Sequence, residues 1–372
     1  MEKALAVVQV LPALNAGGVE RCTLETARAL VAAGHRSIVI SSGGRLVPQL
    51  EAEGSQHIQL PVERKSLLSL RQVGPLRRQL AALNADIVHA RSRVPAWLCW
   101  LALRKMPAAR PHFVTTMHGL HSVSPYSAIM TKGERVIAGS ATVRDYIIEN
   151  YPRCDPARLR LIAEGVDPAE FPYGYQPSVE WLAAWRASFP MLTGKRLLTL
   201  PGRLTRLKGH ADFLSLIAAL RSEFPDVHGL IVGDSEPGKT AYAEWLRAEV
   251  NTAGLADAIT FTGHRSDIRE VLSQSDMVFS LSTKPETFGR TVLEALRLGR
   301  PVMGWNKGGV GEVLAACYPR GQVTPGDHAA LLAQTRDWLQ APDQPADTPL
   351  FQLQDMCDQT LALYAELAAT AG

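Results

Sequence analysis

The chain has 372 residues, of which 46% are hydrophobic and 20% charged. It therefore has enough apolar residues to form packed cores, and disorder is excluded as its main state. At roughly 100 to 200 residues per domain, this length predicts two domains or one large one. With 39 Lys and Arg against 36 Asp and Glu, the net charge is only +3, which argues against a dedicated nucleic-acid binder.

In the first half of the chain, short apolar runs alternate with longer amphipathic ones, as is typical of parallel sheets covered by helices. We expect strands at residues 4–10, 36–41, 87–90, 112–117 and 135–138. We expect helices at residues 20–33, 67–83, 95–105 and 142–151. The apolar start is too short to span a bilayer and runs into a glycine turn, so we interpret it as a buried strand.

A proline-rich stretch then interrupts the alternation, with Pro156, Pro168, Pro172, Pro177 and Pro190 around a short helix at residues 179–188. Such a stretch predicts a domain boundary. Beyond it, strands are expected at residues 196–200, 228–232, 259–261, 277–280 and 301–304. The sequence therefore predicts two α/β domains, at residues 1–172 and 173–348, followed by a C-terminal helix at residues 349–372.

Cysteine usage and charge distribution say more about the compartment and the partners. The five cysteines lie far apart without a C-x-x-C pair, which predicts neither a disulfide framework nor a zinc cluster and favours a reducing, cytoplasmic compartment. Up to residue 175 there are 21 Lys and Arg against 14 Asp and Glu, and beyond it 18 against 22. This asymmetry predicts a first domain that faces an anionic partner, although surface cations without a partner would give the same counts.

One motif matches a phosphate-binding P-loop letter for letter. Residues 233–240 read G-D-S-E-P-G-K-T, which fits G-x-x-x-x-G-K-[ST] after a predicted strand. Against this interpretation, Asp234 and Glu236 would put carboxylates into a loop whose amides should hold phosphates. No predicted strand ends in an aspartate suited to magnesium either. A P-loop NTPase using Gly233 to Thr240 stays an alternative, and the competing expectation is a polar turn with a solvent-facing Lys239.

Three other loops combine flexibility with charge. Gly17 and Gly18 follow the first strand, where paired glycines let a backbone approach a ligand before a helix N-terminus. The loop P-G-R-L-T-R-L-K-G at residues 201–209 places Arg203 and Lys208 after a strand, and two cations there suit a diphosphate. In residues 284–294, two glutamates eight residues apart flank an aromatic-glycine turn, one just before a helix and one about two turns inside it.

Taken together, these motifs resemble glycosyltransferase family 4. They are the early glycine pair, the G-R-x-x-x-x-K-G loop, the E-x7-E element, T-M-H-G at residues 116–119 and G-V-D at residues 165–167. The resemblance implies a GT-B fold, with two Rossmann-like domains facing each other across a donor-binding cleft. The first domain would bind the acceptor and the second the nucleotide-sugar. The final helix would cross back to the first domain.

The resemblance also implies roles for residues of the second domain. Arg203 and Lys208 would bind the donor diphosphate. Glu286 would hold the hydroxyls of the sugar, together with the backbone amides of Phe288 and Gly289. As a physical check, preorganised cations and amides suit the charge that develops on a leaving diphosphate.

Further roles follow from the same resemblance. Glu294 would accept hydrogen bonds from the ribose, His118 would sit over the reacting sugar, and Gly17 and Gly18 would let their loop reach the phosphates. His264 and Arg265 lie in the loop that reads the base in this family. They are weaker candidates for donor binding, because main-chain groups usually make the contacts there. Glu164, where the family often has Asn, and Asp234, where a second glycine is usual, depart from the pattern.

The implied activity is retaining transfer of a hexose or related sugar, with a UDP-sugar as the expected donor. The chain contains no D-x-D triplet, which is consistent with transfer that needs no metal and no cofactor. His121 follows His118 by three residues, but no third metal ligand is in sight. The expected acceptor is an anionic glycolipid or oligosaccharide of the lipopolysaccharide core or another cell-surface glycan. A GT-B protein that binds sugar nucleotides without transferring them is a further alternative.

Cations mixed with leucines and aromatics suggest contact with the cytoplasmic face of the inner membrane. Two groups show this mixture: Arg64, Lys65, Leu67, Leu68, Leu70, Arg71, Leu76, Arg77 and Arg78, and then Arg91, Arg93, Trp97, Trp100, Arg104 and Lys105. Such surfaces suit peripheral attachment to an anionic bilayer, at about 1 kcal/mol per cation. The competing interpretation is that the apolar residues belong to the core and the cations to a solvated surface.

Overall fold

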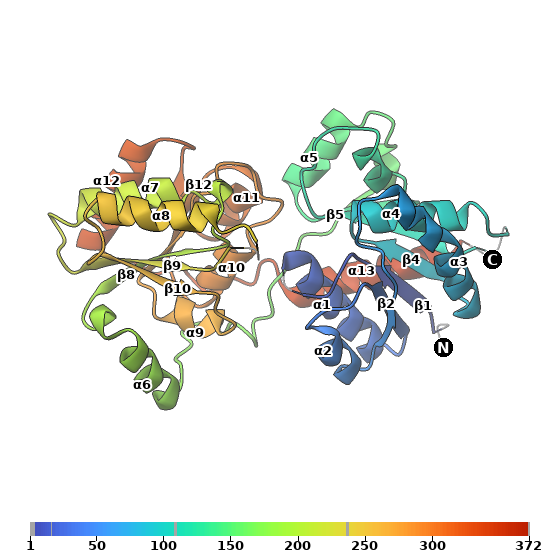
Figure 1. The fold of residues 1–372 in the computed structure, drawn as a ribbon, viewed down its shortest axis with the longest axis horizontal. Helices are drawn as coiled ribbons and strands as arrows, with labels where there is room; N and C mark the ends of the chain where they lie inside the picture. The colour runs from blue at the N-terminus through green and yellow to red at the C-terminus, as the bar shows by residue number, and fades with distance from the viewer. Residues whose placement is uncertain (1–3, 16, 108–109, 236–237, 371–372) are drawn as a thin grey trace. The chain divides into compact units, whose positions relative to one another are not determined.

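The structure, a computed structural model, describes residues 4–15, 17–107, 110–235 and 238–370. The chain forms two units, of which the first comprises Met1–Gly165 with Phe351–Gly372 and the second Val166–Leu350. Each unit is built around its own parallel sheet with helices against it (Figure 1). The predicted pair of Rossmann-like α/β domains is thereby confirmed.

Among the described residues, the sheet of the first unit has the strand order β3-β2-β1-β4-β5-β6-β7, all parallel. Its strands are β1 (Ala6–Val10), β2 (Arg36–Ser41), β3 (Gln56–Gln59), β4 (Ile87–Ala90), β5 (His112–Met117), β6 (Arg135–Ala138) and β7 (Leu159–Leu161). The direction of winding reverses between β1 and β4. The loops that leave these two strands diverge, and the space outside the carboxyl ends at such a reversal is where α/β sheets bind ligands.

The sheet of the second unit repeats this plan with the described order β10-β9-β8-β11-β12-β13, again all parallel. Its strands are β8 (Arg196–Pro201), β9 (Val227–Val232), β10 (Ile259–Gly263), β11 (Met277–Ser280), β12 (Val302–Trp305) and β13 (Gln322–Val323). Here the reversal falls between β8 and β11. The loops after these two strands are therefore the expected ligand-binding loops of the second unit.

Helices connect the strands and cover the sheets. The first unit contains α1 (Gly18–Ala32), α2 (Val47–Ala52), α3 (Val73–Ala82), α4 (Arg93–Leu103), α5 (Ala141–Asn150) and α13 (Leu353–Ala369). The second contains α6 (Val179–Ser188), α7 (His210–Leu220), α8 (Ala241–Thr252), α9 (Ile268–Ser273), α10 (Arg290–Arg297), α11 (Gly308–Cys317) and α12 (His328–Gln340). Short 3₁₀ turns are η1 (Leu67–Gln72), η2 (Ser127–Thr131), η3 (Pro156–Arg158), η4 (Pro190–Leu192), η5 (Arg206–Lys208) and η6 (Pro319–Gly321). None of the described helices is both long and apolar enough to span a membrane.

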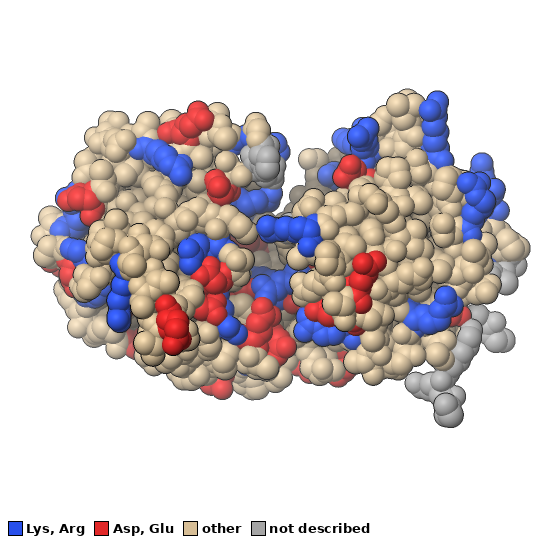
Figure 2. Space-filling view, turned by 60° about the horizontal axis from the view of Figure 1, so that its bottom comes forward, with Lys and Arg blue, Asp and Glu red and all other residues tan. Residues whose placement is uncertain are grey.

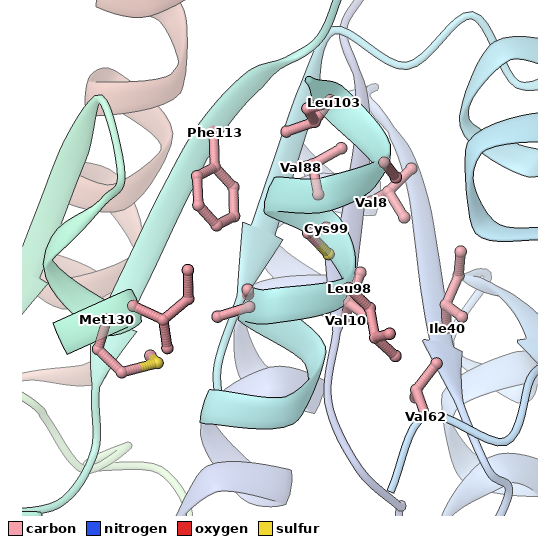
Figure 3. Close-up of a cluster of buried hydrophobic side chains, with 14 of the residues drawn as sticks. Val8, Val10, Ile40, Val62, Val88, Leu98, Cys99, Leu103, Phe113 and Met130 are labelled. Atoms are coloured by element: carbon pink, nitrogen blue, oxygen red, sulfur yellow. The ribbon is translucent and has the colours of Figure 1, made fainter. Parts of the chain in front are cut away.

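Apolar side chains cover both faces of the first sheet. On one face, Val8 packs in a cluster with Leu98 of α4 and Phe113 of β5 (Figure 3). On the other face, Val7 packs in a second cluster with Leu363 of α13. Because alternate residues of a strand point to opposite faces, a sheet covered on both sides needs strands that are apolar throughout. This is why the central strands are easy to recognise in the sequence.

Helix α13 belongs to the first unit although it ends the chain. Its buried residues recur every three or four positions: Met356, Cys357, Thr360, Leu363, Tyr364 and Leu367. This spacing gives the helix one apolar face, which packs on the sheet beside α1. Gly165 passes so close to Gln352 that an added Cβ would lie 2.4 Å from the Gln352 carbonyl carbon. The two chain segments that join the units therefore run side by side at this point.

The unit boundaries lie at 165/166 and 350/351, whereas the sequence predicted 172/173 and 348/349. Pro156 belongs to the first unit, whereas the proline-rich stretch from Pro168 onward belongs to the second unit. Phe171 is buried, the Tyr173 hydroxyl donates to the Pro345 carbonyl at 2.9 Å, and the Tyr175 hydroxyl donates to Glu270 at 3.0 Å.

Several predicted elements need correction. Three strands were missed, β3, β7 and β13, and all lie at sheet edges, where polar residues are tolerated. The single helix predicted at residues 67–83 is η1 followed by α3, with Gly74 and Pro75 in the first turn of α3. The strand predicted at residues 301–304 begins at Val302, and the first strand begins at Ala6.

Surface charge is mixed on the face shown in Figure 2. Lys and Arg side chains alternate there with Asp and Glu, and uncharged surface separates them. This view shows no continuous basic face of the kind that a dedicated nucleic-acid binder presents.

Candidate active site

Two loops meet at the strand reversal of the second sheet. The loop after β8 carries Arg203 and Lys208, and the loop after β11 carries Glu286. The Thr283 amide donates to the Leu207 carbonyl at 2.9 Å, which ties the two loops together. The structure thus brings together a cation and a carboxylate that the sequence placed in separate motifs.

Lys208 and Glu286 form an ion pair in a small pocket. Lys208 Nζ lies 2.8 Å from Glu286 Oε1, and the Ser282 hydroxyl donates to the same oxygen. The two charged side chains are 29% and 30% exposed, so a partly exposed pair of this kind adds little to stability. Gly289 also lines the pocket, and the Gly309 amide donates to the Glu286 carbonyl at 2.9 Å. A ligand anion can therefore replace the Glu286 carboxylate as the partner of the Lys208 ammonium group at little cost in stability. The hydrogen bond from Gly309 holds the backbone of Glu286 in place meanwhile.

The residue after Lys208 has to be glycine. Gly209 has φ = 75°, and an added Cβ would lie 2.0 Å from the Leu281 carbonyl oxygen. Only glycine combines this left-handed conformation with so close an approach. Gly209 therefore lets the Lys208 loop lie directly against the end of β11.

Helix α10 begins at Arg290, with Gly289 as its N-cap residue and buried Phe288 before it. Its first amides point toward the N-terminus, where an anion or a sugar hydroxyl can accept hydrogen bonds from them. Glu294 lies about one turn inside this helix, not two as predicted. It is 4% exposed, and Arg290 Nε donates to its carboxylate at 3.2 Å. Glu294 does not line the Lys208 pocket, so its role at a ribose stays a prediction.

The loop that the family resemblance predicts to read the base lies after β10, next to the loop after β9. The Gly233 amide donates to the Gly263 carbonyl at 3.0 Å, and His264 follows as an exposed side chain. Arg265 Nε donates to Asp267 at 2.8 Å, and its guanidinium lies 5.5 Å from the centre of the Trp185 ring. The side chain of Arg265 is thus engaged away from the Lys208 pocket.

The P-loop alternative gains no support from the loop before α8. An added Cβ at Gly233 would lie 2.0 Å from the Gly202 carbonyl oxygen, so packing of neighbouring loops already requires this glycine. Helix α8 begins only at Ala241, after the last residue of the motif. Glu236 and residue 237 lie outside the described residues.

In the first unit, the predicted site residues follow β1 and β5. Gly17 is the N-cap residue of α1, and both Gly17 and Gly18 are exposed. The side chain of His118, directly after β5, is 7% exposed and lies between Arg91 and Glu164. Burial lowers the pKa of His118, so the imidazole is neutral at physiological pH.

Arg91 is the site residue that sequence reasoning missed. It was grouped with surface cations, but it is 3% exposed, and Leu76 of the same prediction is fully buried. Arg91 directly follows β4, at the strand reversal beside β1. The predicted strand at residues 87–90 already placed Arg91 at the carboxyl end of a strand. This position was the signal that could have identified Arg91 as a site residue.

A metal site is not apparent near His121. Burial lowers the pKa of His121 to about 4, and in the described part of the chain no group of three His, Cys, Asp or Glu side chains is arranged to hold a metal ion. Whether the reaction requires a metal stays a prediction, to be tested directly.

Comparison with known proteins places this geometry in context. Residues 16–170 match the family model Glycosyltransferase Family 4, and residues 183–348 match Glycosyl transferases group 1. A glycosyltransferase from Rickettsia africae is 28% identical with a TM-score of 0.84, over 98% of this chain and 99% of that one. Anabaena HepE, solved with UDP and glucose, is 20% identical with a TM-score of 0.81, over 97% and 100%, and shares the fold.

A curated relative, the D-inositol 3-phosphate glycosyltransferase of Stackebrandtia nassauensis, is 25% identical over 282 residues. The match covers 70% of this chain and 60% of that protein, so the chain spans about three fifths of such relatives. Both family models, the fold and the motif residues at the two strand reversals agree. The chain belongs to glycosyltransferase family 4.

Proposed function

We propose that this chain transfers a hexose or related sugar from a nucleotide-sugar, with UDP as the nucleotide, to a glycan or glycolipid acceptor, with retention of the anomeric configuration. The Lys208–Glu286 pair carries the proposal, because a cation and a carboxylate share one pocket at the strand reversal of the second sheet. The complex of HepE with UDP and glucose supports the choice of nucleotide.

Lys208 and Arg203 account for the departure of the diphosphate. Cleavage of the sugar–phosphate bond leaves negative charge on the diphosphate, and one preorganised donor to such charge is commonly worth about 3 kcal/mol. When the diphosphate engages Lys208, the Glu286 carboxylate is released to accept hydrogen bonds from sugar hydroxyls. The leaving phosphate can take the proton of the acceptor on the same face, so this mechanism uses no dedicated base, no metal and no cofactor.

The donor is tested by thermal unfolding with UDP, GDP, ADP or ATP, each in EDTA and again with magnesium. A ligand at about 100 times its dissociation constant stabilises by roughly 2.7 kcal/mol. Stabilisation by UDP in EDTA supports the proposal and leads to a panel of UDP-sugars. Stabilisation by ATP only with magnesium would instead support the P-loop alternative.

Glu286→Ala separates catalysis from binding. We expect loss of transfer with nearly unchanged UDP affinity, because the carboxylate contacts the sugar and not the nucleotide. Unchanged turnover would contradict the assignment of Glu286. Binding of UDP-sugars by the parent protein without any release of UDP would favour the alternative of a non-catalytic sugar-nucleotide-binding protein.

We further propose a cytoplasmic protein that contacts the inner membrane peripherally and acts on an anionic glycolipid or oligosaccharide of the lipopolysaccharide core or another surface glycan. The supporting feature is a groove of about 360 Å³ in the first unit, between η1 and α4. Leu67, Leu68 and Leu70 of η1 are 86%, 64% and 48% exposed, and Arg64 and Lys65 line the same groove. Exposed leucines beside cations suit the interface of an anionic bilayer.

Vesicle partitioning tests this contact. The wild-type protein should bind vesicles containing phosphatidylglycerol more strongly than phosphatidylcholine vesicles, and a variant with Leu67→Asp and Leu68→Asp should lose this binding. Val179→Asp is the matched control, because Val179 is 77% exposed in the second unit. Equal partitioning of the wild-type protein onto neutral and anionic vesicles would contradict membrane docking.

A further inference from the structure

A buried polar cluster surrounds His118 in the first unit. The side chains of Arg91, His118 and Glu164 line one small cavity at the carboxyl ends of β4, β5 and β7. Of the three, the family resemblance assigns a role to His118 alone. The cluster therefore raises the question of what the buried guanidinium does.

Arg91 is surrounded by neutral acceptors. Its Nε donates to Gln9 Oε1 at 2.8 Å, Nη2 donates to Thr26 Oγ1 at 2.9 Å, and Nη1 contacts Cys22 Sγ at 3.2 Å and His118 Nε2 at 3.3 Å. No ion pair joins Arg91 to a carboxylate in the part of the chain that the structure describes. A cation costs free energy to bury, and neutral partners offset that cost only in part. A lipophilic residue would serve packing better, so the charge itself needs an explanation.

The contact with Arg91 determines the tautomer of His118. A guanidinium has donors and no acceptor, so His118 Nε2 must present its lone pair to Arg91 Nη1. The proton of the neutral ring then resides on Nδ1, which lies 3.6 Å from Glu164 Oε1. An added Cβ at Gly139 would lie 3.2 Å from Glu164 Oε1, so this glycine leaves room for the carboxylate.

We propose that Arg91 is a positioning residue, which holds His118 as the neutral Nδ1–H tautomer with its ring fixed between Arg91 and Glu164. The proposal rests on the proposed function in so far as His118 acts on the sugar, but the geometry it describes does not depend on turnover. It also gives Glu164 a role: the carboxylate faces the Nδ1–H group at 3.6 Å and offsets the charge of Arg91.

Neighbouring charges act on His118 from several elements. Burial lowers the pKa of His118, Glu164 raises it and Arg91 lowers it further. His89 on β4 and His121 after β5 also interact electrostatically with His118, and burial lowers the pKa of both rings. Cys22 of α1 and Thr116 of β5 line the cavity without charge. Removing the Arg91 cation should therefore raise the pKa of His118, and removing the Glu164 charge should lower it.

The direct test is the NMR spectrum of the full chain labelled with ¹⁵N-histidine, in which Nδ1–H and Nε2–H tautomers have different nitrogen shifts. A His118→Gln sample assigns the signal. We expect a neutral His118 with its proton on Nδ1, and loss of this fixed tautomer in Arg91→Gln. A neutral His118 protonated on Nε2 in the wild-type protein would overturn the proposal, whether or not the chain transfers sugar.

The second test is the pH profile of kcat/KM with the donor identified above. As pH falls, activity should disappear with protonation of His118. Arg91→Gln should move this loss to higher pH and Glu164→Gln to lower pH, whereas a merely structural role would move neither. Shifts in the same direction, or none, would refute the assignment.

Arg91→Lys provides the rescue arm. It keeps the positive charge but loses the planar fork that contacts Gln9, Thr26 and His118 together. We expect the acid limb to stay in place while kcat falls roughly tenfold to a hundredfold, since small displacements of reacting groups cost that much. Arg28→Gln is the control, because Arg28 is a half-exposed arginine of the same unit and should leave both readouts unchanged. UDP-induced thermal stabilisation, measured on every variant, tests the donor site separately.

Discussion

The two units share one architecture but treat their charged site residues in opposite ways. In the second unit, Lys208 pairs with Glu286 at 2.8 Å, and both side chains are about 30% exposed. In the first unit, Arg91 is 3% exposed and donates to neutral side chains. The second site has a partly exposed ion pair whose partners a ligand can replace, whereas the first has a buried hydrogen-bond network.

This difference indicates whether mutation of the charged site residues in each unit should affect ligand binding and catalysis or the stability of the fold. An exposed ion pair contributes little to folding, so its removal should affect ligand chemistry more than stability. A buried hydrogen-bond network is costly to leave incomplete, so its removal should affect stability as well. Substitutions in the two units should therefore separate an effect on ligand chemistry from an effect on stability.

The largest expected effect is a loss of turnover on mutation of Lys208 in the second unit. Lys208→Ala should lower sugar transfer about 10²–10³-fold, because it removes a preorganised cation from the leaving diphosphate. Thermal unfolding should change little. Lys195→Ala is the matched control, since Lys195 precedes β8 and donates to the Pro225 carbonyl at 3.1 Å. Equal transfer rates for the two variants would contradict the role of Lys208.

A smaller effect, on stability, is expected from the network of the first unit. His89 is buried, and its Nδ1 lies 2.6 Å from the Tyr364 hydroxyl of α13. Tyr364→Phe should cost about 1–3 kcal/mol in the free energy of unfolding, because a buried ring nitrogen loses its partner. Tyr173→Phe removes a hydroxyl from a 43% exposed tyrosine and should cost much less. Denaturant unfolding of both variants decides the point.

Acid should destabilise both units gradually. Burial lowers the pKa of His121 in the first unit, and of His210 and His228 in the second, from 6.5 to about 4. The unfolded chain therefore binds protons more readily than the folded chain below pH 6.5, so stability present above that pH is lost as pH falls toward 4. Unfolding curves between pH 7 and pH 4 should shift to lower temperature. A constant unfolding temperature across this range would contradict the burial of these rings.

The smallest effect is expected from Lys239→Ala in the P-loop-like motif. Transfer and UDP binding should stay close to wild type, because the geometry of the Lys208 pocket does not involve Lys239. Abolished nucleotide binding would instead show that this second loop holds the phosphates. The variant therefore tests whether the nucleotide binds at the Lys208–Glu286 pair or at the P-loop-like motif of residues 233–240.

Much of the fold was readable from local pattern. The strands at residues 36–41, 87–90, 112–117, 135–138 and 277–280 have the predicted bounds. Nearly all residues of these strands are buried, because helices cover both faces of each sheet, and most of them are therefore apolar. The edge strand β3 reads Q-H-I-Q, with one apolar residue, and could not be distinguished from a loop. Edge positions need fewer apolar residues, so their sequences carry less signal.

The site was predictable in its parts but not in its connections. The motifs pointed to Lys208, Glu286 and His118, and all three lie in loops at carboxyl ends of strands. The depth of Glu294 in α10 and the burial of Arg91 were predicted wrongly. A helix start shifts by several residues without a strong capping signal, and α10 has no side-chain cap.

By itself, the sequence determined the alternation of strands and helices, the glycines that bring loops close together and the charged residue types available at each strand end. Tertiary structure alone decided which of these charges meet. Lys208 and Glu286 are 78 positions apart, and His89 and Tyr364 are 275 positions apart. Such pairs form because parallel strands collect distant loops at one edge, and because the apolar face of α13 must be buried on the sheet of the first unit.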